Sequence, residues 1–141
     1  MRLWHKDLIR VLPRQQLLSQ WRECCCIARN IAVNDTPNHI LVNKIMDYPI
    51  DHFIYYAGSI YTEMLTRGYK CIWKSFEQYE LWPKDGRIKC NSDMLFENWH
   101  NDRYLKQCFY NLQEKFDCGE MTQEEYNTLY ERVWKLLNGD L

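Results

Sequence analysis

Residues 13–33 decide the fold, and they read PRQQLLSQWRECCCIARNIAV. Proline is favoured at the start of a helix, because its missing N–H would have no partner there. The apolar residues that follow recur at helical spacing, and at about 100° per residue they fill one arc: Leu17, Leu18, Trp21, Cys24, Cys25, Ala28, Ile31 and Ala32. The opposite arc is polar, with Gln15, Ser19, Arg22, Cys26 and Arg29, and with Glu23 at its border. The stretch therefore predicts an amphipathic helix from Arg14 to about Val33.

The rest of the chain predicts further helices. One is capped by Asp47, carries Pro49 in its first turn and an apolar stripe to Leu65, and ends before Gly68. Another runs over 102–116 and is closed by Gly119. The last opens on a Thr122–Glu125 capping box and runs to about Leu137. Short helices are predicted at 39–46, 70–79 and 92–99, after an irregular N-terminal arm at 1–12.

No stretch shows convincing strand alternation, and linkers and repeats are absent. The prediction is therefore an all-α fold over residues 1–141. It is a compact single-domain bundle of three to four long helices plus short helices. Its hydrophobic content of 46% excludes a disordered chain.

The cysteines and the apolar runs bear on where the protein works. There are seven cysteines, an odd number, and Cys24, Cys25 and Cys26 are consecutive. No secretory segment and no apolar run of about 18 residues is present. We therefore expect reduced thiols, a cytoplasmic location and no membrane contact. The Cys and His spacings match no metal-ligand pattern, so no metal site is predicted.

The charge is unevenly distributed although the net charge is only −1. Residues 1–74 hold ten Lys and Arg against six Asp and Glu, whereas residues 75–141 hold eight against thirteen. A polyanion is therefore expected to meet the N-terminal part.

Three stretches carry a resemblance to a known family. The run Gln20-Trp21-Arg22-Glu23 lies on the first long helix behind a short arm with Arg2. The stretch 60–69 ends in Arg67-Gly68-Tyr69, and residues 39–44 add a third similar segment. Over roughly residues 1–74 the chain resembles the phage-type pyrimidine-dimer DNA glycosylase/AP lyase family.

The resemblance implies a DNA-repair enzyme that needs no cofactor and excises a damaged pyrimidine from double-stranded DNA. In that family the N-terminal α-amine attacks C1′ of the sugar to form an imine, a Glu on the first helix assists, and β-elimination nicks the strand. The matching residues here are Met1, which the bulky Arg2 should protect from removal, and Glu23. An α-amine titrates near pH 8, so much of it is neutral at cellular pH and ready to attack.

The resemblance also implies a DNA-binding surface made by Arg2, Gln15, Arg22 and Arg29, since Arg holds phosphates through paired hydrogen bonds. The expected protein is a monomer. Two alternatives stay open at this point. One is a non-catalytic DNA-binding module that senses damage, and the other is a helical protein-interaction domain whose acidic C-terminal half binds a basic partner.

Overall fold

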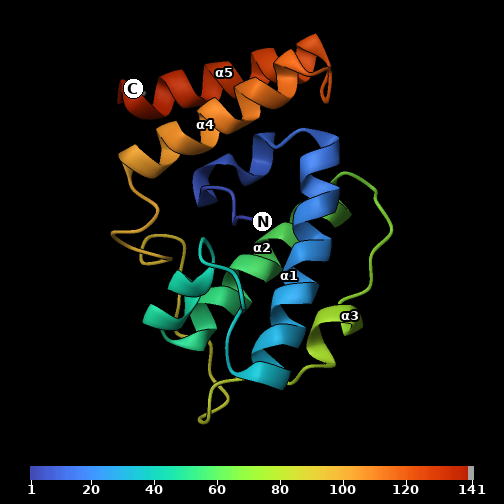
Figure 1. Ribbon diagram of the computed structural model, residues 1–141, viewed down its shortest axis with the longest axis vertical. Helices are drawn as coiled ribbons and strands as arrows, with labels where there is room; N and C mark the ends of the chain where they lie inside the picture. The colour runs from blue at the N-terminus through green and yellow to red at the C-terminus, as the bar shows by residue number, and fades with distance from the viewer. Residues whose placement is uncertain (140–141) are drawn as a thin grey trace.

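The computed structural model describes residues 1–139, and within that range every regular element is helical (Figure 1). Four long helices confirm the predicted all-α class: α1 (Arg14–Asn34), α2 (Ile50–Thr66), α4 (Asp102–Asp117) and α5 (Gln123–Leu137). Three short elements complete the fold: the 3-10 helices η1 (Lys6–Val11) and η2 (Asn43–Asp47), and the single-turn helix α3 (Lys74–Glu77).

The helix ends follow the local chemistry of the sequence. Gly68 follows α2 with φ +80°, which glycine adopts at little steric cost. There the backbone N–H of Gly68 donates to Leu65 and that of Tyr69 to Met64, the pair of bonds that closes a Schellman motif. The Thr122–Glu125 capping box is present with both of its reciprocal hydrogen bonds. These local predictions are confirmed.

Other local predictions need correction. The arm at 1–12 is not wholly irregular, because η1 forms half of it. Asp47 does not cap α2, which begins after Pro49; the proline keeps Tyr48 extended (φ −120°, ψ 157°) and so stops a helix from starting earlier. No helix forms over 92–99, since Phe96 and Asn98 have positive φ.

The two remaining short helices are shorter than predicted. In the 39–46 region a turn precedes η2, which covers only Asn43–Asp47. In the 70–79 region the helix is limited to α3, Lys74–Glu77.

The elements pack in two parts around the N-terminal arm (Figure 1). Helices α4 and α5 form an antiparallel hairpin at the top of the view, and α1 and α2 pack against each other below it. The 3-10 helix η1 contacts both α5 and α2. Buried side chains from the arm and from all four long helices form one core cluster. The arm is therefore held between the two helix pairs, which fixes the position of the N-terminus.

No helix within the described residues is long and apolar enough to cross a membrane.

Candidate active site

A buried glutamine on α1 fastens the N-terminal arm. Gln20 is fully buried on the inner face of the helix, where the buried residues are apolar apart from Gln16 and Gln20. Its side-chain carbonyl Oε1 accepts the backbone N–H of Trp4 at 2.7 Å, and its amide Nε2 donates to the backbone carbonyl of Arg2 at 3.0 Å. The same Nε2 lies 3.1 Å from the Glu23 carboxylate. One amide group therefore fixes both the first residues of the chain and the carboxylate one helical turn away.

Two tyrosines hold the arm from the other helices. The hydroxyl of Tyr56 on α2 donates to the carbonyl of Trp4 at 2.6 Å and lies 3.0 Å from Gln20 Oε1. The hydroxyl of Tyr104 on α4 donates to the carbonyl of Leu3 at 2.6 Å. The backbone of residues 2–4 thus bonds to α1, α2 and α4. Because buried hydrogen bonds orient as well as stabilise, the direction in which Met1 leaves the core is set.

Glu23 is half-buried beside the start of the chain. Desolvation raises the pKa of its carboxyl above the ordinary value. The positive charge of the N-terminal amine opposes that rise most strongly, followed by a hydrogen bond from the Arg2 backbone and by the charge of Lys115. Met1 itself is 42% exposed. The amine is therefore open to solvent and close enough to the carboxylate for their charges to interact.

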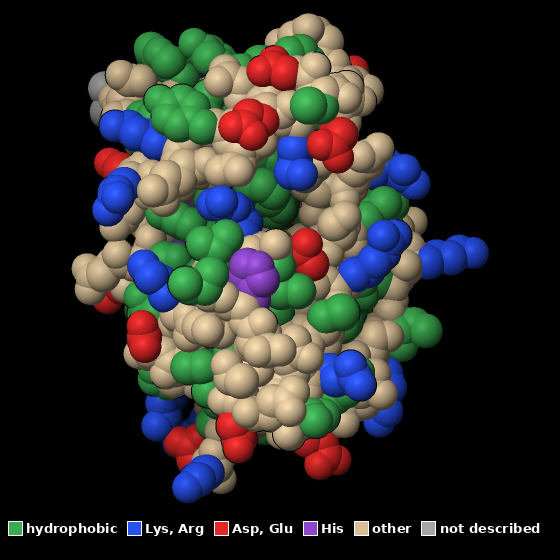
Figure 2. All heavy atoms as spheres, in the orientation of Figure 1, with side chains coloured by type: hydrophobic (Ala, Val, Ile, Leu, Met, Phe, Trp, Pro, Cys, Tyr) green, Lys and Arg blue, Asp and Glu red, His purple; other side chains and the backbone are tan. Residues whose placement is uncertain are grey.

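The predicted DNA-binding residues on α1 form a line. Gln15, Arg22 and Arg29 are all exposed and are spaced seven residues apart, so they follow one stripe of the helix. Each step along that stripe is about 10 Å. Figure 2 has the same orientation as Figure 1 and shows Lys and Arg side chains to the left and to the right of the centre of this face. The stripe therefore presents cationic and amide groups in one direction, next to Glu23.

Arg2 differs from the other three. Its guanidinium lies over the ring of Trp4, 5.7 Å from the centroid, and its charge acts on Tyr104 and Cys108. The residue is half-buried. Arg2 is thus turned toward the core of the arm, and its predicted contact with phosphate is not tested by this geometry.

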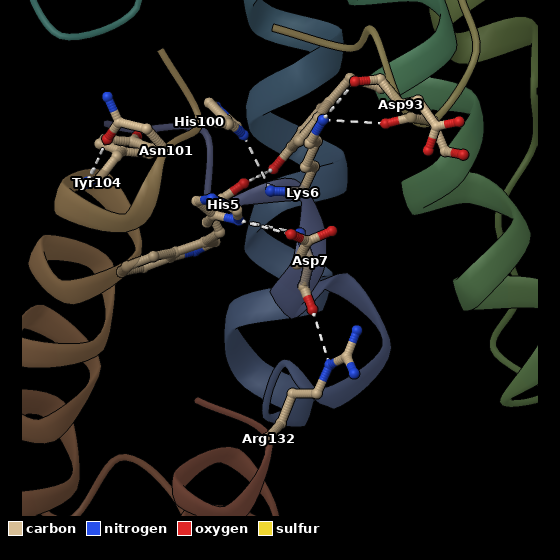
Figure 3. Close-up of polar contacts among 11 residues, drawn as sticks. His5, Lys6, Asp7, Asp93, His100, Asn101, Tyr104 and Arg132 are labelled. Atoms are coloured by element: carbon tan, nitrogen blue, oxygen red, sulfur yellow. Dashed lines mark hydrogen bonds and ion pairs between the residues drawn. The ribbon is translucent and has the colours of Figure 1, made fainter. Parts of the chain in front are cut away.

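A pair of stacked histidines connects the arm to α4 (Figure 3). The rings of His5 and His100 stack with 5.2 Å between their centroids, and both residues are buried. His100 Nδ1 accepts the backbone N–H of Lys6 at 2.9 Å. Desolvation lowers the pKa of His5 and takes that of His100 well below the usual value. Both imidazoles are therefore neutral supports of the arm at neutral pH.

The sequence analysis missed the residues that position the arm. Gln20 was quoted only as part of a motif, and Tyr56 and Tyr104 were not singled out. One signal for Gln20 was present: Leu17, Trp21 and Cys24 surround it at helical spacing, which predicts that position 20 faces the core. No sequence pattern indicates that Tyr56 or Tyr104 reaches the arm, because those bonds join residues 52 and 101 positions apart.

Groups of three or more His, Cys, Asp or Glu able to hold a metal are absent from the described part of the chain. Comparison with known proteins gives one finding. Residues 1–72, just over half of the chain, match the model of a family described as pyrimidine dimer DNA glycosylase. No curated protein and no solved structure matches. The matched residues include the arm, Gln20, Glu23 and Tyr56, whereas Tyr104 and the α4–α5 hairpin lie beyond them.

Proposed function

Because the chain belongs to the pyrimidine dimer DNA glycosylase family, we propose that it excises a damaged pyrimidine from duplex DNA and then nicks the strand as an AP lyase. The proposed nucleophile is the α-amine of Met1, and the proposed acid–base group is Glu23. The observation that carries the proposal is the Gln20 amide, whose Nε2 donates to the Arg2 carbonyl at 3.0 Å and lies 3.1 Å from the Glu23 carboxylate. The first residues of the chain are therefore held beside Glu23, and the charge of the N-terminal amine acts on its carboxyl.

The reaction would proceed by covalent catalysis. The nitrogen lone pair of the amine forms a bond to C1′ of the damaged nucleotide, and the bond from C1′ to the base breaks with its electron pair leaving on the base. The nitrogen lone pair then forms a double bond to C1′ and expels the ring oxygen O4′, which takes up a proton. The product is a protonated imine, and the amine proton lost on the way passes to Glu23 or to the solvent. Loss of a C2′ proton expels the 3′-phosphate and nicks the strand. Glu23 would accept and return these protons and stabilise positive charge at the sugar.

Burial suits Glu23 to this task. A carboxyl whose pKa is raised toward neutrality exchanges protons more readily at cellular pH than one with an ordinary pKa. The positive charge of the nearby amine works in the opposite direction and limits this rise. The amine attacks C1′ only in its neutral form, and in that form it no longer opposes the rise in the pKa of Glu23. The carboxyl would then be better suited to give a proton to the departing base.

The proposed DNA contacts are Arg22 and Arg29, with Gln15 on the same stripe of α1. They would hold phosphates on either side of the lesion while the damaged base leaves the stack. Arg2 is proposed to act near the sugar, at the base of the arm. A base within intact duplex is out of reach of an amine fixed on the protein, so the DNA is expected to bend on binding.

The test is borohydride trapping on duplex oligonucleotides that carry an abasic site or a thymine dimer. Reduction converts the imine to a stable amine, and digestion with mass analysis identifies the peptide that carries the sugar. We expect the peptide that contains Met1. A crosslink on any lysine peptide would contradict the amine assignment. Trapping on the abasic duplex but not on the dimer would limit the proposal to AP lyase activity.

Glu23→Gln separates the proposed chemistry from binding. The amide keeps the shape and the hydrogen bond to Gln20 but cannot act as a proton acceptor. We expect trapping and nicking to fall at least about 100-fold at equal DNA saturation, with DNA affinity unchanged or higher. Glu114→Gln is the matched control, because Glu114 is exposed on α4. Equal activity of wild type and Glu23→Gln would remove Glu23 from the mechanism. DNA binding with no trapped product from the wild-type protein would instead favour a module that only senses damage.

A further inference from the structure

A cavity of about 650 Å³ opens on another side of the arm. Its walls come from η1, from α2, from residues between Trp73 and Leu95, and from Arg132 on α5. No residue of α1 lines it, so it is separate from Met1 and from Glu23. Its volume lies within the range of small-molecule sites.

Three cations border this cavity without a carboxylate partner. Lys6, Arg10 and Arg132 all line it, and none of them forms an ion pair within residues 1–139. Cations gathered in this way repel one another and favour an anion in the space between them.

Two of these cations are held in place by neutral groups (Figure 3). The ammonium of Lys6 donates to the backbone carbonyls of Ser92 and Asp93, at 3.0 and 3.4 Å. The guanidinium Nε of Arg132 donates to the carbonyl of Asp7 at 3.4 Å. Carbonyls orient the side chains but do not neutralise them. Among the described residues one donor of Lys6 and the donors of both terminal nitrogens of Arg132 have no partner. The site is thus organised before an anion arrives.

The acidic residues at the cavity do not cancel this charge. Glu63 is bound by Arg67, whose Nε lies 2.8 Å from its carboxylate. Asp7 is left as the one carboxylate among the described lining residues without a Lys or Arg partner; His5 Nδ1 lies 3.9 Å from it but accepts the Asp7 N–H and carries no charge there. Three cations and one carboxylate give the lining groups a net charge of about +2. That net charge balances the charge of about −2 that a phosphate monoester carries at neutral pH.

The rest of the wall is mixed. Ile54, Trp73 and Ile88 supply apolar surface, and Ser59, Thr62 and Ser92 add hydroxyl groups, so a bound molecule would find apolar and polar surface beside the cations. The floor includes Gly58 in the middle of α2, and a Cβ built there meets nothing within 4 Å. The helix backbone is therefore bare where it borders the cavity, and a ring-sized group has room to lie against it.

We propose that this cavity is a second binding site, separate from the proposed catalytic centre, for a phosphate monoester carried on a sugar or a nucleoside. The phosphate lies between Lys6, Arg10 and Arg132, and the sugar or base lies against the mixed wall beside Gly58. Since none of the proposed catalytic residues lines the cavity, this inference does not depend on the glycosylase chemistry.

The test is isothermal titration of the full chain with thymidine 5′-monophosphate, ribose 5-phosphate, inorganic phosphate and thymidine. The two monoesters are expected to bind, inorganic phosphate to bind at least tenfold more weakly, and thymidine to give no signal. Lys6→Gln and Arg132→Gln should each weaken binding at least tenfold, because each removes a charged donor. Lys135→Gln is the matched control; it removes the same charge from α5 outside the cavity and should change affinity less than twofold.

Changes at Gly58 test the position of the ligand independently of charge. Gly58→Ala should keep affinity within about threefold, since a Cβ has open space, whereas Gly58→Phe should abolish binding by filling the cavity. Circular dichroism identifies variants that fail to fold, and the two charge variants keep the test decisive if Gly58→Phe does. No binding of either monoester to the wild type would overturn the proposal. So would equal losses in the Lys6 and Lys135 variants, or inorganic phosphate binding as tightly as the monoesters. Glu23→Gln should leave this binding unchanged, so a failed glycosylase proposal is distinguishable from a failed cavity proposal.

Discussion

Replacement of Gln20 by Leu tests whether the arm is positioned by its buried amide. The change removes the acceptor of the Trp4 N–H and the donor to the Arg2 carbonyl, at 2.7 and 3.0 Å. It also removes the bond to Glu23. A buried N–H left without a partner costs about 1–3 kcal/mol, and a carbonyl near the surface costs about 1 kcal/mol. Leucine returns a small part of this through burial of its apolar surface, so we expect a net loss of roughly 2–3 kcal/mol.

The assay has two readouts. Thermal unfolding should show a midpoint lowered by roughly 6–9 °C, taking about 3 °C per kcal/mol for a domain of this size. Imine trapping at a temperature where both proteins are folded should fall by about 100-fold, since a shift of about 1 Å in a reacting group is enough for such a loss. The second effect is the informative one, because stability alone would leave trapping by the folded fraction unchanged.

Gln16→Leu is the matched control, one turn earlier on the same helix. Gln16 is also buried, but its Oε1 has no hydrogen-bond partner among residues 1–139, so the same substitution breaks no contact of that atom there. Its unfolding midpoint and its trapping should stay near those of the wild type, or stability should rise. Equal loss of trapping in the Gln16 and Gln20 variants would refute the assignment of arm positioning to the Gln20 amide.

Two further predictions concern salt and pH. Arg22→Ala should weaken binding to all DNA sequences alike and reduce the slope of log affinity against log salt by about 0.9, the value for one lost phosphate contact. Arg87→Ala, on the loop between α3 and α4, is the control and should change neither the affinity nor the slope. Fluorescence anisotropy across salt concentrations measures both quantities. For pH, the lowered pKa values of His5 and His100 mean that the unfolded chain binds more protons than the folded chain once pH falls below about 6.5. The free energy of unfolding is therefore highest above that pH and falls as the pH drops toward the folded-state pKa values, by up to about 1.4 kcal/mol per pH unit for each histidine. Urea unfolding between pH 5 and 8 measures this dependence. A free energy of unfolding that does not change with pH would mean that the imidazoles are not buried in the neutral form.

Helices with strong local signals were predictable from the sequence, and their boundaries were predicted where a cap or a glycine marks them. Gly68 and the Thr122–Glu125 box act within a few residues, so they can be recognised without knowledge of the fold. The helix predicted for 39–46 was too long and the one predicted for 92–99 was wrong, for a related reason. In those stretches apolar residues such as Val42 and Phe96 are buried by tertiary packing, and the backbone follows that packing rather than helical periodicity.

The residues of the candidate site, too, were predictable where a local pattern fixes them and unpredictable where tertiary packing does. Glu23 and the line of Gln15, Arg22 and Arg29 belong to one amphipathic helix, whose period fixes their relative directions. The contacts that give the arm its position join segments far apart in the chain. A hydrogen bond from Tyr104 to Leu3 depends on how α4 packs over the arm, and periodicity carries no information about that packing.

The half of the chain beyond the matched residues is needed for the site that the first half forms. Tyr104 bonds to the Leu3 carbonyl and His100 to the Lys6 N–H, so α4 and the segment before it hold the arm on the side opposite to Gln20. At the other end of the arm, the Glu125 carboxylate accepts the backbone N–H of Arg14 at 2.7 Å. That bond pairs the first N–H of α1, which no helical carbonyl can reach. The α4–α5 hairpin therefore holds the arm near both of its ends, through Tyr104 at Leu3 and Glu125 at Arg14, and in this way the acidic half of the protein supports the position of the groups proposed for the chemistry.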